Sequence, residues 1–171
     1  MLQKLQNNRF ITISHKDRCC RFLQTGDIFS FSDGPFMINQ LYGNAKDGSM
    51  NNIYLRVYRA ETPEVFPLLG IHSNSRLSCS DDCLKQEGSA GGISYEVTFR
   101  LKGPFWFWNV SLSGSGETVD LLYGQDIGTG PSGNAYANEL YTAQYLGHSI
   151  FETDNGYVIC SRQNNGLPGC R

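Results

Sequence analysis

Three pairs of carboxylates are the residues whose type and spacing could support catalysis. They are Asp81 with Asp82, Glu117 with Asp120, and Glu152 with Asp154. Two carboxylates that flank a glycosidic bond can cleave it, one as general acid and the other as base or nucleophile. All three pairs lie near predicted turns, where a solvated acid is the ordinary case. Their spacing alone therefore gives weak support for a glycosidase.

Other catalytic and ligand-binding patterns are incomplete. The chain has no Gly-x-Ser-x-Gly sequence that would place a serine nucleophile on a sharp turn. Residues 128–134 have the composition of a phosphate-binding loop, but they lack its lysine, and Pro131 removes one backbone donor. We therefore predict a solvent loop there. We also predict no catalytic residue, no cofactor-binding residue and no metal ligand.

The six cysteines are explained better as thiols than as disulfides. They are Cys19, Cys20, Cys79, Cys83, Cys160 and Cys170. Cys79 and Cys83 are separated by three residues, but no second pair of cysteines or histidines stands at zinc-ligand spacing. Reduced thiols, some of them buried, are the preferred interpretation, and a structural zinc site is the alternative.

Charge and hydropathy argue against several classes of partner. Charged residues make up 18% of the chain and the formal net charge is −2, so there is no basic footprint for a nucleic acid. No apolar run reaches the roughly 18 residues that a membrane-spanning helix needs. The first ten residues lack the apolar centre of a signal peptide. We therefore expect a cytoplasmic protein with neither a nucleic-acid partner nor a membrane partner.

The elements that must position these residues are predicted to be strands. Residues 53–59 and 93–101 alternate between apolar and polar side chains, which is typical of half-buried strands. Turn signals around residues 103–104 and 113–116 predict a meander of three antiparallel strands, at 93–101, 105–112 and 118–123. Many short strands and 19 glycines together favour an all-β, antiparallel sandwich.

The remaining segments are assigned as follows. Further strands are predicted at residues 28–31, 36–41 and 157–160, a short helix at 138–147, and a long polar connection at 73–92. We divide the chain into an N-terminal extension (1–24), a β-sandwich domain (25–164) and a tail (165–171).

Residues 105–109, FWFWN, hold both tryptophans of the chain. A strand would direct Phe105 and Phe107 to one face and Trp106 and Trp108 to the other. A core strand with an interface on its outer face is the preferred interpretation. A sugar-stacking platform is the second. Stacking on a nucleic acid comes last, because it needs a basic groove alongside.

Four long segments of the sequence, at 36–58, 66–75, 117–128 and 138–164, resemble one known family. They begin FMINQLYGNAKDG, FPLLGIHSNS, ETVDLLYGQDIG and NELYTAQYLGHS. The chain is similar, from about residue 25 to about residue 164, to the N-terminal region of bacterial glycoside phosphorylases of glycoside hydrolase family 94, the cellobiose phosphorylase family. The 1,2-β-oligoglucan phosphorylase branch is the nearest in these segments.

The resemblance implies a β-sandwich of the supersandwich, galactose mutarotase-like type. In the family this domain precedes a helical linker and an (α/α)6 barrel that carries the active site. The intact enzymes cleave a β-glucosidic bond with inorganic phosphate as co-substrate, invert the anomeric centre and need no metal. No barrel residue is present here, so no catalytic position can be transferred.

The resemblance therefore implies a non-catalytic domain or fragment of a β-glucan phosphorylase, with a reading frame truncated or shifted near Arg171. A stand-alone carbohydrate-binding sandwich is the alternative.

The resemblance also implies partners and contact residues. A β-glucan or oligosaccharide would contact the loops at 44–52 and 124–138. The candidate contact residues are Trp106, Trp108, Asn44, Asp47, Asn51, Gln125 and Asp126. The outer face of 105–109 is the first candidate for the surface that the missing linker and barrel would cover. We expect an isolated chain to associate with itself, for example as a homodimer.

Overall fold

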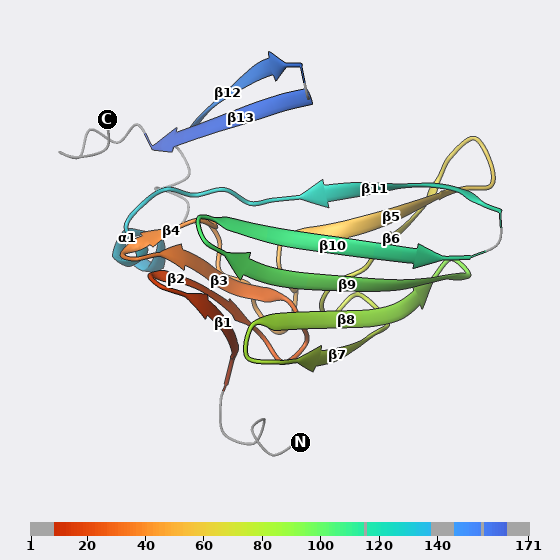
Figure 1. Cartoon of the computed structure of the whole chain (residues 1–171), viewed down its shortest axis with the longest axis horizontal. Coiled ribbons are helices and arrows are strands. Elements are labelled where there is room, and N and C mark those ends of the chain that lie inside the picture. Colours follow the sequence, from red (N-terminus) through yellow and green to blue (C-terminus); the bar gives the residue numbers. More distant parts are fainter. Residues whose placement is uncertain (1–8, 115, 138–145, 155, 164–171) are drawn as a thin grey trace.

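The computed structural model describes residues 9–114, 116–137, 146–154 and 156–163, and most of them lie in strands (Figure 1). The strands are β1 (Ile11–His15), β2 (Arg18–Phe22), β3 (Ile28–Asp33), β4 (Phe36–Met37), β5 (Asn52–Tyr58), β6 (Glu64–Pro67), β7 (Ser75–Cys79), β8 (Cys83–Ala90), β9 (Ile93–Lys102), β10 (Phe105–Ser113), β11 (Thr118–Gly124), β12 (Leu146–Thr153) and β13 (Gly156–Gln163). One six-residue helix, α1 (Ser132–Ala137), lies among the described residues.

Three antiparallel sheets form the body of the fold. Their strand orders are β1-β2-β3-β4, β10-β9-β8-β7 and β11-β5-β6. One half of the inner face of the β7–β10 sheet packs against the β1–β4 sheet, and the other half packs against the β11-β5-β6 sheet. This arrangement confirms the predicted all-β antiparallel sandwich.

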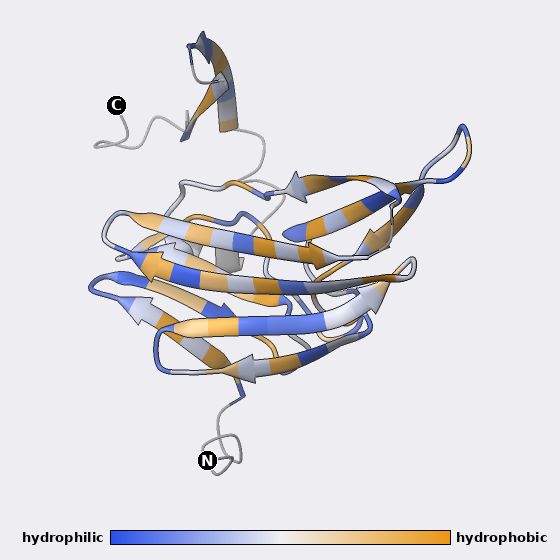
Figure 2. Ribbon diagram, turned by 45° about the vertical axis from the view of Figure 1, so that its right-hand side comes forward, coloured by the Kyte–Doolittle hydropathy of each residue, from blue (hydrophilic) through white to orange (hydrophobic). Residues whose placement is uncertain are grey.

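Strand β9 supplies the shared spine of both cores. Its residues alternate between buried and more exposed, as the sequence pattern predicts, and Figure 2 shows the hydropathy of the strands. Phe99 and Leu101 belong to the core under the first sheet, whereas Ile93, Tyr95 and Val97 belong to the core under the third. Each fully buried apolar side chain of this size contributes roughly 1.5–3 kcal/mol. The alternation along one strand therefore joins the two halves of the sandwich.

The predicted meander is half correct. Strands β9 and β10 form a hairpin in which Phe105 pairs with Lys102. Strand β11 pairs with β5 instead of β10, with Thr118 opposite Tyr58. One ion pair, between Arg56 of β5 and Asp120 of β11, accompanies this register. The three strands therefore belong to two sheets, which corrects the prediction.

Two hairpins were not predicted. Strands β1 and β2 lie within residues 11–22, which the sequence analysis placed in an N-terminal extension, and they pair with β3. The turn between them places Lys16 in the left-handed region, at φ 54°. Such a turn position is usually occupied by glycine or asparagine, so the sequence gives no signal for this hairpin. Strands β7 and β8 occupy most of the segment predicted to be a polar connection, 73–92. That prediction was wrong.

Two local predictions need correction. The strand expected at 36–41 is limited to β4, because the side chain of Asn39 turns the following backbone: Oδ1 accepts from Phe31 N at 2.6 Å. Residues 128–134 are not a free solvent loop. Gly128 N donates to Ile38 O at 2.6 Å, Gly130 O accepts from Met37 N at 2.9 Å, and α1 begins at residue 132.

Strands β12 and β13 form a hairpin whose described side chains are mostly exposed. The last predicted strand, 157–160, lies inside β13, and β12 was not predicted. Of the helix predicted at 138–147, residues 138–145 lie outside the described residues and Leu146 and Gly147 belong to β12. Ile150 and Tyr157 are 68% and 73% exposed. A two-stranded hairpin is marginally stable alone, and this one forms a separate sheet with exposed apolar side chains.

Among the described residues, no helix is long and apolar enough to cross a membrane.

Candidate functional site

The two tryptophans of β10 point toward the core. The Trp106 ring packs edge-on against Phe31, with centroids 5.0 Å apart, and the Trp108 ring lies 4.8 Å from Phe99. Phe105 and Phe107 occupy the opposite face, where they are 61% and 43% exposed. The strand therefore separates the two pairs as the sequence predicts. The partly buried indoles pack against the hydrophobic cores, which agrees with the interpretation of this segment as a core strand with an exposed outer face.

A chain of polar contacts starts at Trp108 and follows the end of β11. Trp108 Nε1 donates to Tyr123 OH at 3.2 Å, and Tyr123 OH donates to Gln125 Oε1. Gln125 Nε2 donates to Asp126 O at 2.7 Å. The chain links three of the predicted contact residues, Trp108, Gln125 and Asp126.

Asp126 brings the two predicted contact loops together. Its backbone N donates to Asn51 Oδ1 at 2.7 Å, and its Oδ2 accepts from the backbone N atoms of Gln40 and Leu41 at 2.9 and 2.6 Å. Asn51 is only 2% exposed. The side chains of Asn51 and Asp126 therefore hold the loops in place, and the neighbouring exposed groups are the ones free to meet a ligand.

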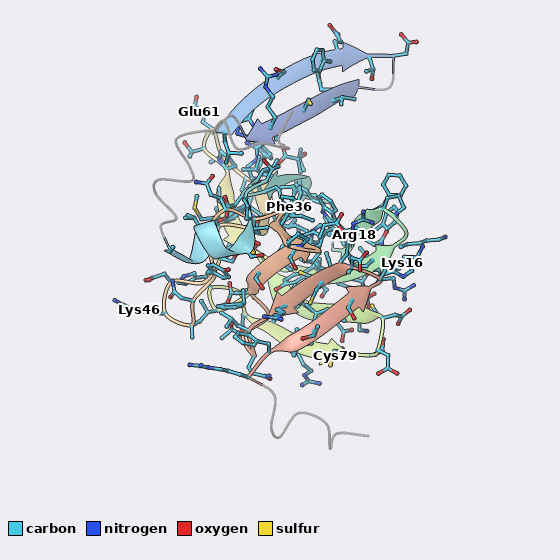
Figure 3. The ribbon with its side chains drawn as sticks, turned by 90° about the vertical axis from the view of Figure 1, so that its left-hand side faces the viewer. Lys16, Arg18, Phe36, Lys46, Glu61 and Cys79 are labelled. Carbon is cyan, nitrogen blue, oxygen red and sulfur yellow. The ribbon has the colours of Figure 1, made fainter. Side chains whose placement is uncertain are left out.

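Asn44 and Asp47 occupy an exposed turn in the first of these loops. Asn44 Oδ1 accepts from Lys46 N at 2.9 Å and from Asp47 N at 2.8 Å, which fixes the turn. Lys46 extends outward from it (Figure 3). The side chain of Asp47 is exposed, and its carbonyl lies 3.1 Å from His72 Nε2. No described contact joins this turn to the Trp108 chain.

The carboxylates considered for catalysis are engaged at the surface. Asp120 forms a two-point ion pair with Arg56, at 2.7 and 2.6 Å, and accepts from Tyr58 OH at 3.0 Å. The hydrogen bonds from Arg56 lower the pKa of Asp120 below its ordinary value. A general acid needs the opposite shift. Asp82 accepts from Ser80 Oγ at 3.0 Å, and Glu152 and Asp154 are exposed on the β12–β13 hairpin.

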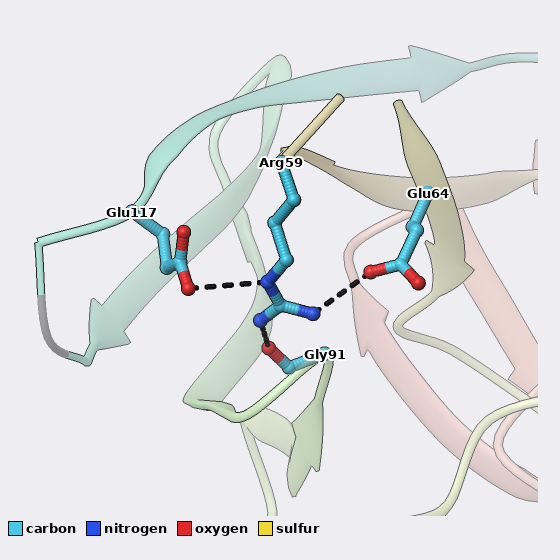
Figure 4. Close-up of polar contacts among 4 residues, drawn as sticks. All are labelled: Arg59, Glu64, Gly91 and Glu117. Atoms are coloured by element: carbon cyan, nitrogen blue, oxygen red, sulfur yellow. Dashed lines mark hydrogen bonds and ion pairs between the residues drawn. The ribbon is translucent and has the colours of Figure 1, made fainter. Parts of the chain in front are cut away.

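Glu117 belongs to an ion-pair cluster around Arg59 (Figure 4). Arg59 Nε donates to Glu117 at 3.1 Å and Nη1 donates to Glu64 at 2.8 Å, while Nη2 donates to Gly91 O. One guanidinium thus joins the end of β5 to β6, to the β8–β9 turn and to the approach to β11. Glu117 and Asp120 are thus each held by a different arginine.

The cysteines show no metal-binding arrangement in the part of the chain that the structure describes. Groups of three or more histidine, cysteine, aspartate or glutamate side chains close enough to hold a metal are absent there. Cys79 and Cys83 lie on either side of the β7–β8 turn, and Cys79 is exposed (Figure 3). Cys20 is fully buried, and burial raises the pKa of its thiol.

The sequence analysis missed a network of buried polar side chains. Gln86 is 1% exposed; its Nε2 donates to Gly26 O and its Oε1 accepts from Gly70 N, both at 3.0 Å. Asp27 is 2% exposed and accepts from Ile71 N at 2.8 Å. The network ties β8 to the segments before β3 and after β6. Because the network places a polar side chain, Gln86, on the inner face of β8, the usual alternation of apolar and polar residues is not visible in the sequence of this hairpin.

The fold defines the chain as a β-sandwich domain of the all-β class. Residues 21–170 match the family described as the SOGP N-terminal domain, and the chain belongs to that family. The chain is also similar to a curated protein of Listeria innocua serovar 6a named 1,2-beta-oligoglucan phosphorylase, with 26% identity over 152 residues. The matched region is 89% of this chain and 14% of that relative, so the chain spans a small part of the relative's length.

Proposed function

We propose that this chain acts as the non-catalytic N-terminal domain of an inverting β-glucan phosphorylase in cytoplasmic carbohydrate metabolism. The observation that carries the proposal is the family match over residues 21–170, together with the similarity to a relative named as an oligoglucan phosphorylase. The ion-paired state of Asp120 and Glu117 supports the non-catalytic role. Inorganic phosphate would be the co-substrate of the whole enzyme, acting outside this domain.

The domain would contact a β-glucan or oligosaccharide along the loops at 44–52 and 124–126. The hydrogen bond from Asp126 N to Asn51 Oδ1 supports this proposal, because it places the two loops side by side. Asp47 offers an exposed carboxylate in the first loop, and Gln125 lies half-buried in the second. Trp108 stays connected to it through Tyr123, so the tryptophans would act by supporting the loop end of β11.

The linker and (α/α)6 barrel of such an enzyme would cover the exposed apolar surface of the sandwich. Phe105 and Phe107 on β10, with Leu121 and Leu122 on β11, are each more than two-fifths exposed. Exposed apolar side chains that gather on one surface mark an interaction site or an aggregation liability. Without its partner the surface would promote self-association, including formation of a homodimer.

The proposal is tested by binding and activity measured on the same chain. A 1,2-β-linked glucan oligomer is titrated into the protein by calorimetry, and release of glucose 1-phosphate is assayed with inorganic phosphate present. We expect saturable binding without phosphorolysis, and weaker binding in Asp47→Ala and Gln125→Ala. Glu61→Ala, an exposed substitution in another loop (Figure 3), is the control.

Release of glucose 1-phosphate by this chain alone would refute the non-catalytic role. Absence of binding in the parent chain would refute the proposed glucan contact. Loss of binding in Trp108→Ala with an unchanged fold would favour the stand-alone carbohydrate-binding module instead.

A further inference from the structure

Strand β10 leaves one backbone edge of its sheet unpaired. It pairs with β9 over nine residues, from Phe105 to Ser113, and no strand in the described part of the chain pairs with its other side (Figure 1). It is also the longest edge strand of the three sheets that form the body of the fold. The N–H and C=O groups on such an edge are a template for pairing with a strand from another chain.

The edge of β10 lacks the features that keep exposed edges apart. Proteins protect an edge strand with charged side chains, proline, bulges or a short length. Residues 105–113 contain no charged residue, no proline and no glycine, and each of them pairs one-to-one with a residue of β9. By contrast, the opposite edge of the same sheet, β7, has five residues and carries Arg76. We therefore expect β10 to accept an antiparallel strand.

The outer face of β10 changes from large to small side chains along the strand. Phe105 and Phe107 are exposed at its start, Asn109 in its middle, and Ser111 and Ser113 at its end. When two copies align antiparallel about a two-fold axis at Asn109, Phe105 of one copy lies opposite Ser113 of the other, and Phe107 lies opposite Ser111. Each exposed ring then meets a small side chain, so this face of the strand is complementary to itself.

The inner face and the centre of β10 fit the same alignment. Trp106 would lie opposite Leu112 of the other copy and Trp108 opposite Val110, and all four side chains are apolar and only half-buried. Aromatic and apolar side chains that face each other across two strands stabilise the pairing. The two Asn109 amides would meet at the axis, where each amide can both donate and accept a hydrogen bond. This self-complementarity makes a second copy of the chain the best-matched occupant of the edge.

We propose that two copies of this chain pair through their β10 strands, antiparallel about Asn109, so that their β7–β10 sheets join into one continuous sheet. All nine residues of β10 take part in this register, because Asn109 is the middle residue of Phe105–Ser113. The inference rests on the self-association proposed above. It assigns the homodimer to a strand edge, which is distinct from the exposed side chains of β11.

Sedimentation velocity of the full chain tests the proposal, with circular dichroism as the check that each variant is folded. We expect the parent to form a dimer. Asn109→Lys would place two like charges opposite each other at the axis, so it should weaken dimerisation at least about tenfold. Ser94→Lys, an exposed position on the interior strand β9, adds the same charge away from the edge and should leave the dimer unchanged. Leu122→Lys on β11 should reduce only association beyond the dimer.

Disulfide cross-linking tests the register. In the proposed pairing the two Cα atoms of residue 109 lie roughly 4.5–5.5 Å apart, within the range that a disulfide spans. The two Cα atoms of residue 111 are separated by four residues along the strands, roughly 14 Å, which is too far. Under mild oxidation Asn109→Cys should therefore yield a disulfide-linked dimer beyond the level of the parent, and Ser111→Cys should not. If Asn109→Lys does not fold, this comparison decides the question.

Three results would overturn the inference: a monomeric parent, a dimer that the folded Asn109→Lys variant leaves intact, or equal cross-linking in the two cysteine variants. A dimer that Leu122→Lys abolishes and Asn109→Lys does not would also overturn it. That last result would leave intact the self-association proposed for the exposed side chains of β11.

Discussion

Replacing Trp108 by alanine should destabilise the domain before it affects any ligand. The Trp108 ring contacts Phe99 at 4.8 Å and Phe22 at 6.4 Å, and it packs against both hydrophobic cores. Deleting a buried large aromatic costs about 3–5 kcal/mol, and each aromatic pair contributes about 0.5–1.5 kcal/mol of such a loss beyond area burial. Because Trp108 is only partly buried, we expect the lower end, about 3 kcal/mol.

Urea denaturation of three variants measures this effect. Trp108→Phe keeps most of the ring contacts and loses the hydrogen bond to Tyr123, so it should cost about 1 kcal/mol. Phe107→Ala, on the outer face of the same strand, should change the free energy of unfolding by less than about 0.5 kcal/mol. In thermal unfolding, a loss of about 3 kcal/mol corresponds to a Tm lowered by roughly 6–12 °C for a chain of this size.

The opposite pattern would refute this reasoning. If Trp108→Ala keeps the stability of the parent within about 1 kcal/mol and abolishes glucan binding, the ring is a ligand platform and the packing argument fails.

Three further predictions concern charge, backbone and surface. The pKa of Asp120 is lowered in the folded state, so the unfolded state binds a proton at this carboxylate first as the pH falls. The stabilisation from the ionised Asp120 is therefore present above about pH 4 and is lost below it. Chemical denaturation between pH 7 and pH 3 should show that the difference in unfolding free energy between the parent and Asp120→Asn becomes smaller as the pH falls. A Cβ at Gly70 would lie 1.9 Å from Asp27 Oδ1, so Gly70→Ala should lower the free energy of unfolding by more than about 3 kcal/mol in chemical denaturation. Gly34 also has a left-handed backbone but open space around it, so Gly34→Ala should cost only about 1 kcal/mol. Equal losses in the two variants would contradict this reasoning. Size-exclusion chromatography should show self-association that Leu122→Lys reduces, and a parent chain that stays monomeric at high concentration would exclude an adhesive surface.

The sequence predicts the strands whose inner faces are apolar. Strands β5 and β9 alternate cleanly, and the two sides of 105–109 follow from the same periodicity. Strand β8 could not be recognised, because its inner positions include Gln86 and Gly88, which serve the polar network and the Tyr95 ring. The pairing of β11 with β5 depends on contacts that join distant segments, and a single sequence does not reveal them.

The candidate contact residues were predictable only in part. Four of them, Trp108, Gln125, Asp126 and Asn51, are connected by hydrogen bonds in the fold. The sequence identifies their loops, but it does not show that the side chains of Asn51, Gln125 and Asp126 are already hydrogen-bonded to backbone groups.

The pairing of β5 with β11 also has a consequence for how the domain is made. Arg56 and Asp120, which face each other in this pairing, are 64 residues apart in the chain. During synthesis one edge of β5 therefore stays open while the whole β7–β10 sheet is produced. Non-local pairing of this kind slows folding, and an open edge can recruit strands from other chains. The folding step most open to misassembly during synthesis is therefore the completion of the β11-β5-β6 sheet. In this step β11 pairs with β5, and Arg59 forms its ion pair with Glu117.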